Sequence, residues 1–192
     1  MRLRDHTRMQ LEDLKARASR GEFFRFTMFW GPQNEADHVT ESCLSQWYPA
    51  PFARDGVRYL TAEHWMMAEK ARLFGDAAML ERILATESPR EAKQLGGLVR
   101  RFDESTWKAH RFEIVVRGNM SKFSQNPALL AFLEQTGEAI LVEASPVDRV
   151  WGIGLARHDE RAHNPLTWRG LNLLGFALMQ ARERLRASTG EP

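Results

Sequence analysis

A helical period dominates the pattern of apolar and polar positions along this chain. Residues 3–19 are largely polar but include Leu11 and Leu14, and Gly21 follows, which predicts a helix packed on the rest of the protein. Start and stop signals predict further helices over residues 61–75, 76–86, 88–97, 104–120, 126–137 and 170–186.

Several of these helices begin at residues that favour the N-cap position. Thr61, Asp76 and Ser88 each stand directly before a helical pattern, where a side-chain oxygen can accept a hydrogen bond from a free backbone N–H. Ser88 is followed by Pro89 and Glu91, so a capping box is expected at this start.

Strand patterns are few. The segment "FFRFTMFWG", residues 23–31, alternates in part, and "AILVEA", residues 139–144, has the strongest strand composition in the chain. A polar segment rich in Pro and Gly lies between residues 32 and 56 and is expected to be a loop. The pattern predicts a mainly α, compact single domain, in which six or seven helices accompany two or three short strands.

Composition and charge exclude several classes of protein. The 192 residues are 43% hydrophobic and 27% charged with a formal net charge of +2, as in an ordinary soluble domain. The N-terminal segment lacks an apolar signal region, and no apolar run approaches the roughly 18 residues of a membrane span. Cys43 is a single cysteine without zinc-type spacing nearby. We expect a cytoplasmic protein without a membrane segment, a bound metal or a cofactor.

The segment "YLTAEHWMMAEKA" places unusual groups on one helix face. On a helix that begins near residue 62, Glu63, Met66, Met67 and Lys70 follow the spacing i, i+3, i+4 and i+7. The two charged groups would frame a methionine patch and could act on one ligand. The alternative from the pattern alone is a surface carboxylate that compensates the helix dipole and a surface lysine.

A second candidate segment is "VEASPVDRVWGIGL", residues 142–155. A strand that ends in a loop carrying Glu143, Ser145, Asp148 and Trp151 can present an acid beside an aromatic wall. The alternative is that Asp148 is only a turn residue and Trp151 a core residue.

Tryptophans form the third candidate group. Trp47, Trp107, Trp151 and Trp168 lie near predicted loops or helix starts, and indole faces can stack on a base. Core filling is the alternative for each of them. His64 would point away from Glu63 on a helix and is expected to be a packed or capping histidine.

Six segments of the chain resemble the NADAR family, also called the YbiA-like family, in their order and approximate spacing. The resemblance covers about residues 23–186. The segments are "LSQWYPAPF", "YLTAEHWMMAEKA", "SPREAKQLGG", "KFSQNPALLAFLEQTG", "LVEASPVDRVWGIGL" and "WRGLNLLGFALM".

The resemblance implies a compact, mostly helical YbiA-like fold that hydrolyses N-glycosidic bonds between ribose and a base or amine. Similar proteins act on phosphoribosylated intermediates of riboflavin biosynthesis or remove ADP-ribose from modified guanine in nucleic acid. Carried over by motif, the acidic residue of the T-x-E-H segment is Glu63, the following lysine is Lys70, and the D-x-x-W-G pair is Asp148 with Trp151. The tryptophan before the long helix is Trp107.

Cleavage of a ribosyl C–N bond leaves positive charge at the anomeric carbon and negative charge on the leaving base. One carboxyl should therefore donate a proton or activate water while another stabilises the cation, and Glu63 and Asp148 are the expected pair. Lys70 could bind a phosphate or hydroxyl, or attack an opened sugar as an amine to form a Schiff base. Direct hydrolysis is favoured.

Two positions depart from the family pattern. Gly97 replaces a common arginine, so the phosphate contact is expected from Lys93, Arg100 or Arg101. Gln46 replaces an asparagine, beside Trp47. These two departures leave the substrate open between ADP-ribosylated guanine, which we favour, and a riboflavin-pathway intermediate.

The expected organisation is an N-terminal helical extension over residues 1–21, a NADAR domain over 22–187 and a disordered tail over 188–192. Expected partners are a small ribosylated or ADP-ribosylated substrate, which includes ADP-ribosylated DNA. Two alternatives from other classes stay open. One is a module that binds ADP-ribose without cleaving it, and the other is a lead helix that docks a partner.

Overall fold

A computed structural model describes residues 6–31 and 38–189 of the chain. In this part of the chain the α-helices are α1 (His6–Ser19), α2 (Ala62–Leu73), α3 (Ala77–Ala85), α4 (Pro89–Gly97), α5 (Glu104–Ser124), α6 (Pro127–Gln135) and α7 (Leu173–Thr189). Short 3-10 helices are η1 (Glu41–Leu44), η2 (Glu160–His163) and η3 (Pro165–Thr167). The strands are β1 (Phe26–Phe29), β2 (Phe52–Arg54), β3 (Val57–Tyr59) and β4 (Ile140–Glu143). The predicted mainly helical fold with minor sheets is confirmed.

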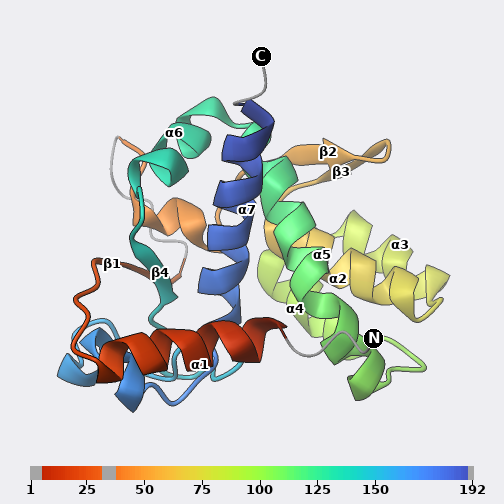
Figure 1. Cartoon of the computed structure of the whole chain (residues 1–192). Coiled ribbons are helices and arrows are strands. Elements are labelled where there is room, and N and C mark those ends of the chain that lie inside the picture. Colours follow the sequence, from red (N-terminus) through yellow and green to blue (C-terminus); the bar gives the residue numbers. More distant parts are fainter. Residues whose placement is uncertain (1–5, 32–37, 190–192) are drawn as a thin grey trace.

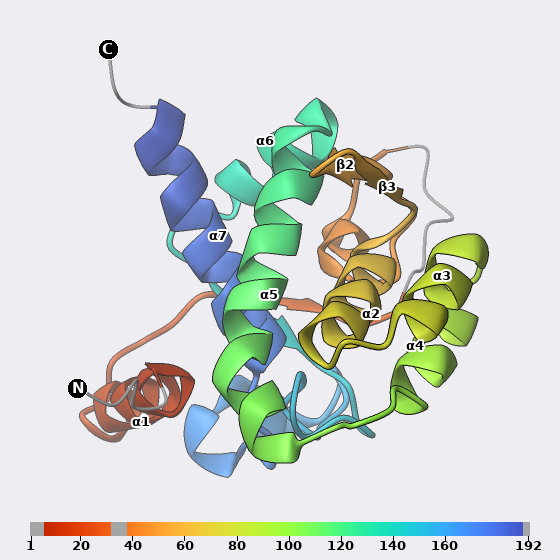
Figure 2. The ribbon, with the colours of Figure 1, turned by 90° about the vertical axis from the view of Figure 1, so that its right-hand side faces the viewer.

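Two helices form the centre of the molecule. Figure 1 shows α5 and α7 side by side, with α2, α3 and α4 on one side of them and the β1–β4 pair on the other. The turned view of Figure 2 places α5 in front of α7 and keeps α2, α3 and α4 together. Helix α2 packs on α3, α4 and α5, so its surface is largely enclosed by other helices.

The β1–β4 pair joins distant parts of the chain. The strands are parallel, with Phe26 opposite Ile140 and Phe29 opposite Glu143. Parallel neighbours cannot be joined by a tight turn, and here the crossover contains α2 to α6. This pairing, together with the packing of α7 on β4, holds Glu143 at the end of its strand.

Strands β2 and β3 form an antiparallel hairpin, of which β2 and the turn lie in the segment 32–56 that the sequence predicts as a loop, while β3 follows that segment directly. Its turn residues Asp55 and Gly56 have φ values of 51° and 77°. Positive φ at both central residues is the backbone of a type I′ hairpin turn, for which Asp-Gly is a preferred pair. The hairpin was missed because each strand has only three residues, too few for a visible alternation.

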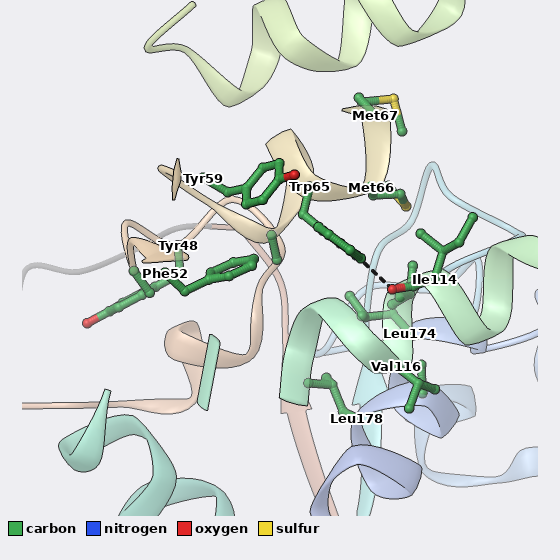
Figure 3. Packing of buried hydrophobic residues seen from close by; sticks show 14 of the residues in the cluster. Tyr48, Phe52, Tyr59, Trp65, Met66, Met67, Ile114, Val116, Leu174 and Leu178 are labelled. Carbon is green, nitrogen blue, oxygen red and sulfur yellow. Dashed lines mark hydrogen bonds between the residues drawn. The ribbon is translucent and has the colours of Figure 1, made fainter. Parts of the chain in front are cut away.

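The tryptophan of α2 fixes this helix against α5. Trp65 is almost completely buried, and its Nε1 donates to the Ile114 carbonyl at 2.8 Å (Figure 3). The ring of Tyr59 meets the indole edge-on at 5.2 Å between centroids. A Cβ at Gly118 would lie 2.2 Å from the indole, so the close approach requires glycine there. Removal of such a buried indole costs about 3–5 kcal/mol.

A second, smaller core lies under α1. Leu11 and Leu14 are buried against Trp168 and Phe176, as the pattern of the lead helix predicts. The Trp168 indole donates to the Ala162 carbonyl, so this tryptophan is a core residue and not part of an aromatic site.

The predicted starts of α2, α3 and α4 are confirmed in detail. The side chains of Thr61, Asp76 and Ser88 accept from the backbone N–H of the third residue that follows each of them. The capping box is incomplete, because the Glu91 carboxylate accepts from the Thr86 hydroxyl instead of the Ser88 backbone.

Helix ends differ more. Helix α5 continues to Ser124, four residues beyond its predicted end, and α7 begins at Leu173 because Asn172 adopts a φ of 53°. Helix α7 includes residues 188 and 189 of the expected tail, and the rest of that tail lies outside the described residues. Within the described ranges, no helix is both long enough and apolar enough to cross a bilayer.

Candidate active site

A cavity of about 270 Å³ lies between α2, α4, the start of α5 and the loops that follow η1 and β4. All of the residues predicted as catalytic line it, namely Glu63, Lys70 and Asp148. Most of the predicted binding residues line it as well, namely Gln46, Trp47, Lys93, Trp107 and Trp151. The fold therefore brings together groups that are separated by up to about a hundred positions in the sequence.

One wall of the cavity is a single face of α2. Glu63, Met66, Met67 and Lys70 all line the cavity, as their helical spacing predicts. His64 turns the other way: Nδ1 pairs with the Thr61 hydroxyl at 2.8 Å and Nε2 with the Thr86 carbonyl at 3.1 Å. The expectation of a packed histidine at this position is confirmed.

Glu63 is a buried carboxyl in the first turn of α2. The whole residue is only 3% exposed to solvent. Its side-chain oxygen Oε1 has no hydrogen-bond partner within the described part of the chain. The Trp47 side chain donates to this carboxyl. Burial raises the pKa of Glu63 to about 7, against the opposing effects of Lys93 and Trp47. With this pKa, Glu63 can exchange a proton near neutral pH.

Lys70 lies at the aromatic end of the cavity. Its Nζ donates to the Gly96 carbonyl at 2.8 Å and lies 4.3 Å from the Phe102 ring centroid and 5.6 Å from that of Trp107. Burial lowers the pKa of this amine. The amine is thus held by one carbonyl and two rings, and it faces the cavity.

The opposite wall contains Asp148 in the loop after β4. Its Oδ1 accepts from the backbone N–H groups of Val150 and Trp151, both at 2.8 Å, and its own N–H donates to the Ser145 hydroxyl at 3.1 Å. Asp148 is therefore a turn residue and a cavity residue at once. The two N–H donors to one oxygen fix the position of this carboxyl group.

A third carboxyl, Glu143, completes the acidic part of the cavity. The sequence placed it in the candidate segment but did not identify it as a site residue. Its Oε2 is buried and finds no hydrogen-bond partner in the described ranges. Burial and the charges of Asp148 and Glu63 raise its pKa to about 8. The signal that could have found it is the position of a carboxyl at the end of a buried strand.

The segment that carries Gln46 and Trp47 is held in place by hydrogen bonds with buried residues of α5. Gln46 Nε2 donates to Asn119 Oδ1 at 3.1 Å, and its backbone carbonyl accepts from the Glu63 N–H at 3.0 Å. Lys122 is completely buried and donates to the carbonyls of Cys43 at 2.6 Å and Ser45 at 2.8 Å. Burial lowers the pKa of Lys122 to about 7. Nothing in the sequence pattern identified this lysine as a support of the site.

A family model described as the NADAR domain matches residues 28–186, and 159 of 192 residues are more than half of the chain. The chain belongs to the NADAR family. The predicted family is therefore confirmed.

Relatives of this NADAR protein include enzymes. The chain is 43% identical over 145 residues to an N-glycosidase of Acanthamoeba polyphaga mimivirus, and the aligned residues are 73% of this chain and 85% of the relative. It is 31% identical over 135 residues to N-glycosidase YbiA of Escherichia coli, and these residues are 70% of this chain and 76% of YbiA. The enzyme class expected from the sequence, an N-glycosyl hydrolase, is the one for which these relatives are named.

Two further likenesses concern the fold and the pathway. The NMR structure of Escherichia coli YbiA has a TM-score of 0.71 to this chain at 26% identity and covers 89% of this chain and 90% of its own. A riboflavin biosynthesis protein of Vibrio vulnificus is 30% identical over 143 residues, which are 74% of this chain and 35% of that protein.

Of the three residues predicted to contact a phosphate, only one lines the cavity. Lys93 lines the cavity of this NADAR protein, but Arg100 and Arg101 do not. Arg100 instead pairs with Asp76 at 2.7 Å. Gly97 lines the cavity, and a Cβ built there would have no described atom within 4 Å. The position at which the family pattern has arginine is thus open space.

Proposed function

We propose that this protein hydrolyses the bond between C1 of a ribose and the nitrogen of a base or amine. The observation that carries the proposal is the meeting of Glu63 and Asp148, from separate elements, in one cavity with aromatic walls. Cleavage of this bond needs one group that exchanges a proton and one that stabilises an oxocarbenium ion. Glu63 and Asp148 have the environments for these two roles.

In the proposed reaction Asp148 faces the anomeric carbon as an anion. Its backbone N–H donors hold the carboxylate in place before the cation forms, so little reorganisation is needed in the transition state. Glu63 exchanges a proton with water or with the leaving group, which its raised pKa permits at neutral pH.

Tryptophans supply the binding surface. Trp47, Trp107 and Trp151 reach the cavity from separate elements and can hold the flat face of a base or cover the ribose. The volume of about 270 Å³ is near the lower end of small-molecule sites, so the ribose and the scissile bond fill it. Larger parts of a substrate then extend outward past Gly97 and Lys93.

We favour ADP-ribosylated guanine, free or in nucleic acid, as the substrate. The open space at Gly97 leaves room for the second half of ADP-ribose, and Lys93 can meet a phosphate at the same edge. The alternative substrate is a phosphoribosylamino-pyrimidine of riboflavin biosynthesis, which the name of the Vibrio vulnificus relative favours.

A covalent route through Lys70 is the second candidate mechanism, because burial lowers the pKa of its amine and so favours the nucleophilic form. Treatment of the reacting mixture with borohydride would trap a Schiff base as a stable adduct on Lys70. We expect no adduct, since direct hydrolysis by the carboxyls needs no covalent intermediate.

The decisive experiment incubates the purified protein with ADP-ribosyl-guanine oligonucleotide and, separately, with the phosphoribosylamino-pyrimidine. Products are separated by liquid chromatography and identified by mass spectrometry, with Glu63→Gln as the control. Release of ADP-ribose from the first substrate supports the favoured activity, and release of ribose 5-phosphate from the second supports the alternative. Recovery of both ligands unchanged, together with measurable binding, would identify a binding module instead of an enzyme.

A further inference from the structure

Glu143 differs from the other carboxyls of the cavity in how its side chain is satisfied. Its backbone is held on both sides: the N–H donates to Asn172 Oδ1 at 3.0 Å, and the carbonyl accepts from the Ile153 N–H at 3.0 Å. Its side chain, in contrast, ends in the cavity with Oε2 buried and without a hydrogen-bond partner in residues 6–31 and 38–189. A rigid backbone thus presents a carboxyl that awaits a partner.

The charged groups around Glu143 come from several elements. Glu63 and Lys70 line the cavity from α2, Lys93 from α4 and Asp148 from the loop after β4. The two acids act on Glu143 more strongly than Lys93 does. A carboxyl that faces two anions without a bound donor is more stable in its neutral form.

The other two acids have what Glu143 lacks. Trp47 donates to Glu63, and Lys93 is the strongest charge acting on it. Asp148 accepts two backbone N–H bonds at 2.8 Å. When three neighbouring carboxyls share fewer protons than they can hold, the proton resides where the anion is least stabilised, which is Glu143.

We propose that Glu143 is the general acid of this site and gives its proton to the leaving nitrogen. This inference rests on the proposed N-glycosidase function and adds a third catalytic residue to it. A separate acid leaves Glu63 free to act as the base that activates water, and Asp148 free to stabilise the cation.

The proposed cycle balances. As the C1–N bond breaks, its electron pair stays on nitrogen, which takes the proton of Glu143. Water attacks C1, the new C–O bond forms, and the displaced proton passes to ionised Glu63. The site then holds neutral Glu63 and ionised Glu143, and transfer of one proton between them restores the starting state. The net change is addition of one water across the C1–N bond.

The first test needs no substrate. In carbon NMR of protein labelled at glutamate carboxyls, recorded across pH, Glu63 and Glu143 should both stay neutral above the ordinary glutamate range, and Glu143 should titrate at the higher pH. Glu143→Gln should remove the signal that titrates at the highest pH, Glu63→Gln should remove the other raised signal, and the exposed control Glu81→Gln should leave both in place. Persistence of the highest-titrating signal in Glu143→Gln, or its absence from the wild type, would overturn the proposal.

The second test varies the leaving group. Glu143→Gln should lower kcat about 10²–10⁴-fold for a leaving group that must be protonated, such as a purine or amine. For a ribosyl pyridinium, whose nitrogen leaves as a neutral molecule without a proton, the loss should be at least tenfold smaller. Equal losses on both substrates would contradict an acid role and indicate a structural one.

The two tests separate the two levels of the proposal. A neutral Glu143 in a protein that cleaves neither substrate would refute the general-acid role together with the proposed function, but not the placement of the proton. Turnover with an ionised Glu143 would refute this inference alone. If Glu143→Gln does not fold, Glu143→Asp with aspartate labelling should move the high-titrating signal to an aspartate carboxyl, and its failure to do so would overturn the inference.

Discussion

On one side of the cavity, α2 contributes Glu63, Met66 and Lys70 from one continuous helix. On the other side, Glu143 and Asp148 come from a strand end and the loop behind it. The helical wall is positioned by the hydrogen bonds of its own backbone and by the buried Trp65. The loop wall has only the last residue of the short strand β4 as repeating structure, and the loop behind that strand has none.

The loop wall is held instead by the first residues of α7 and by Asn172 before them. The N–H groups of Asn172, Leu173 and Leu174 donate to the carbonyls of Gly152, Val150 and Trp151 respectively. The Asn172 side chain also accepts from the Glu143 N–H and donates to the Leu141 carbonyl at 2.9 Å. One wall thus depends on local periodicity and the other on long-range bonds. The two walls should respond differently to mutation.

The largest expected effect is on the helical wall, where a substitution can abolish a catalytic group while the protein keeps its fold. Glu63→Gln should lower kcat about 10²–10⁴-fold, because the proton-exchanging carboxyl is lost. The fold should persist, since Gln replaces a buried carboxyl that already has an unpaired oxygen. Steady-state kinetics and thermal unfolding measure the two effects. Glu69→Gln, on α2 but outside the cavity lining, is the matched control and should stay active.

Asn172→Ala, which changes the loop wall, should lower both the stability and the activity of the protein. It leaves the Glu143 N–H and the Leu141 carbonyl without their partners, which should lower the free energy of unfolding by about 2–4 kcal/mol. It should lower activity as well, because Glu143 loses its backbone support. Urea unfolding measures the stability change. Asn172→Gly is the control, because glycine adopts the positive φ of this position without strain and therefore shows the effect of the lost hydrogen bonds alone. An Asn172→Ala variant as stable as the wild type would contradict the proposed difference between the two walls.

The buried acids should make stability depend on pH with a defined sign. The folded protein keeps a proton on Glu63 up to a pKa of about 7, while the unfolded chain releases it near 4.5. The folded state therefore binds more protons in this window, and the free energy of unfolding should fall by about 1–3 kcal/mol as the pH rises through it. Glu143, with a pKa of about 8, acts in the same direction over a wider window.

Denaturant titrations at about pH 5 and about pH 7 check this prediction. Glu63→Gln and Glu143→Gln should each be less sensitive to pH than the wild type. Above pH 7 the buried Lys122 acts in the opposite direction, because the unfolded chain binds its proton up to a higher pH than the folded state does. A wild-type stability that rises between pH 5 and 7 would contradict the neutral forms of both acids.

The smallest expected effect is at Gly97, which lines the cavity as the last residue of α4 and belongs to neither of these walls. Gly97→Arg should change the free energy of unfolding by less than about 1 kcal/mol, because its Cβ meets no described atom within 4 Å and its φ is not positive. A guanidinium at this edge should lower KM for a phosphorylated substrate by up to about tenfold and leave kcat nearly constant. Gly97→Gln is the uncharged control of similar reach. Equal KM values for the two variants would show that no phosphate passes this edge.

Predictions from sequence succeeded where the relevant physics is local. The caps at Thr61, Asp76 and Ser88 and the shared face of Glu63 and Lys70 depend on residues within two helical turns of each other, and all are present in the structure. The strands of the β2–β3 hairpin were missed because they are too short to show a period.

The sequence by itself determined the mainly helical class, the starts of α2, α3 and α4, the aromatic content and the α2 face of the site. Only the tertiary structure decided that Glu143 joins Glu63 and Asp148, that Arg100 pairs with Asp76 outside the cavity, and that Lys122 supports Ser45 from within the core. Such contacts join residues tens of positions apart. The energy of a buried charge depends on which distant groups surround it, and the linear pattern does not contain that information.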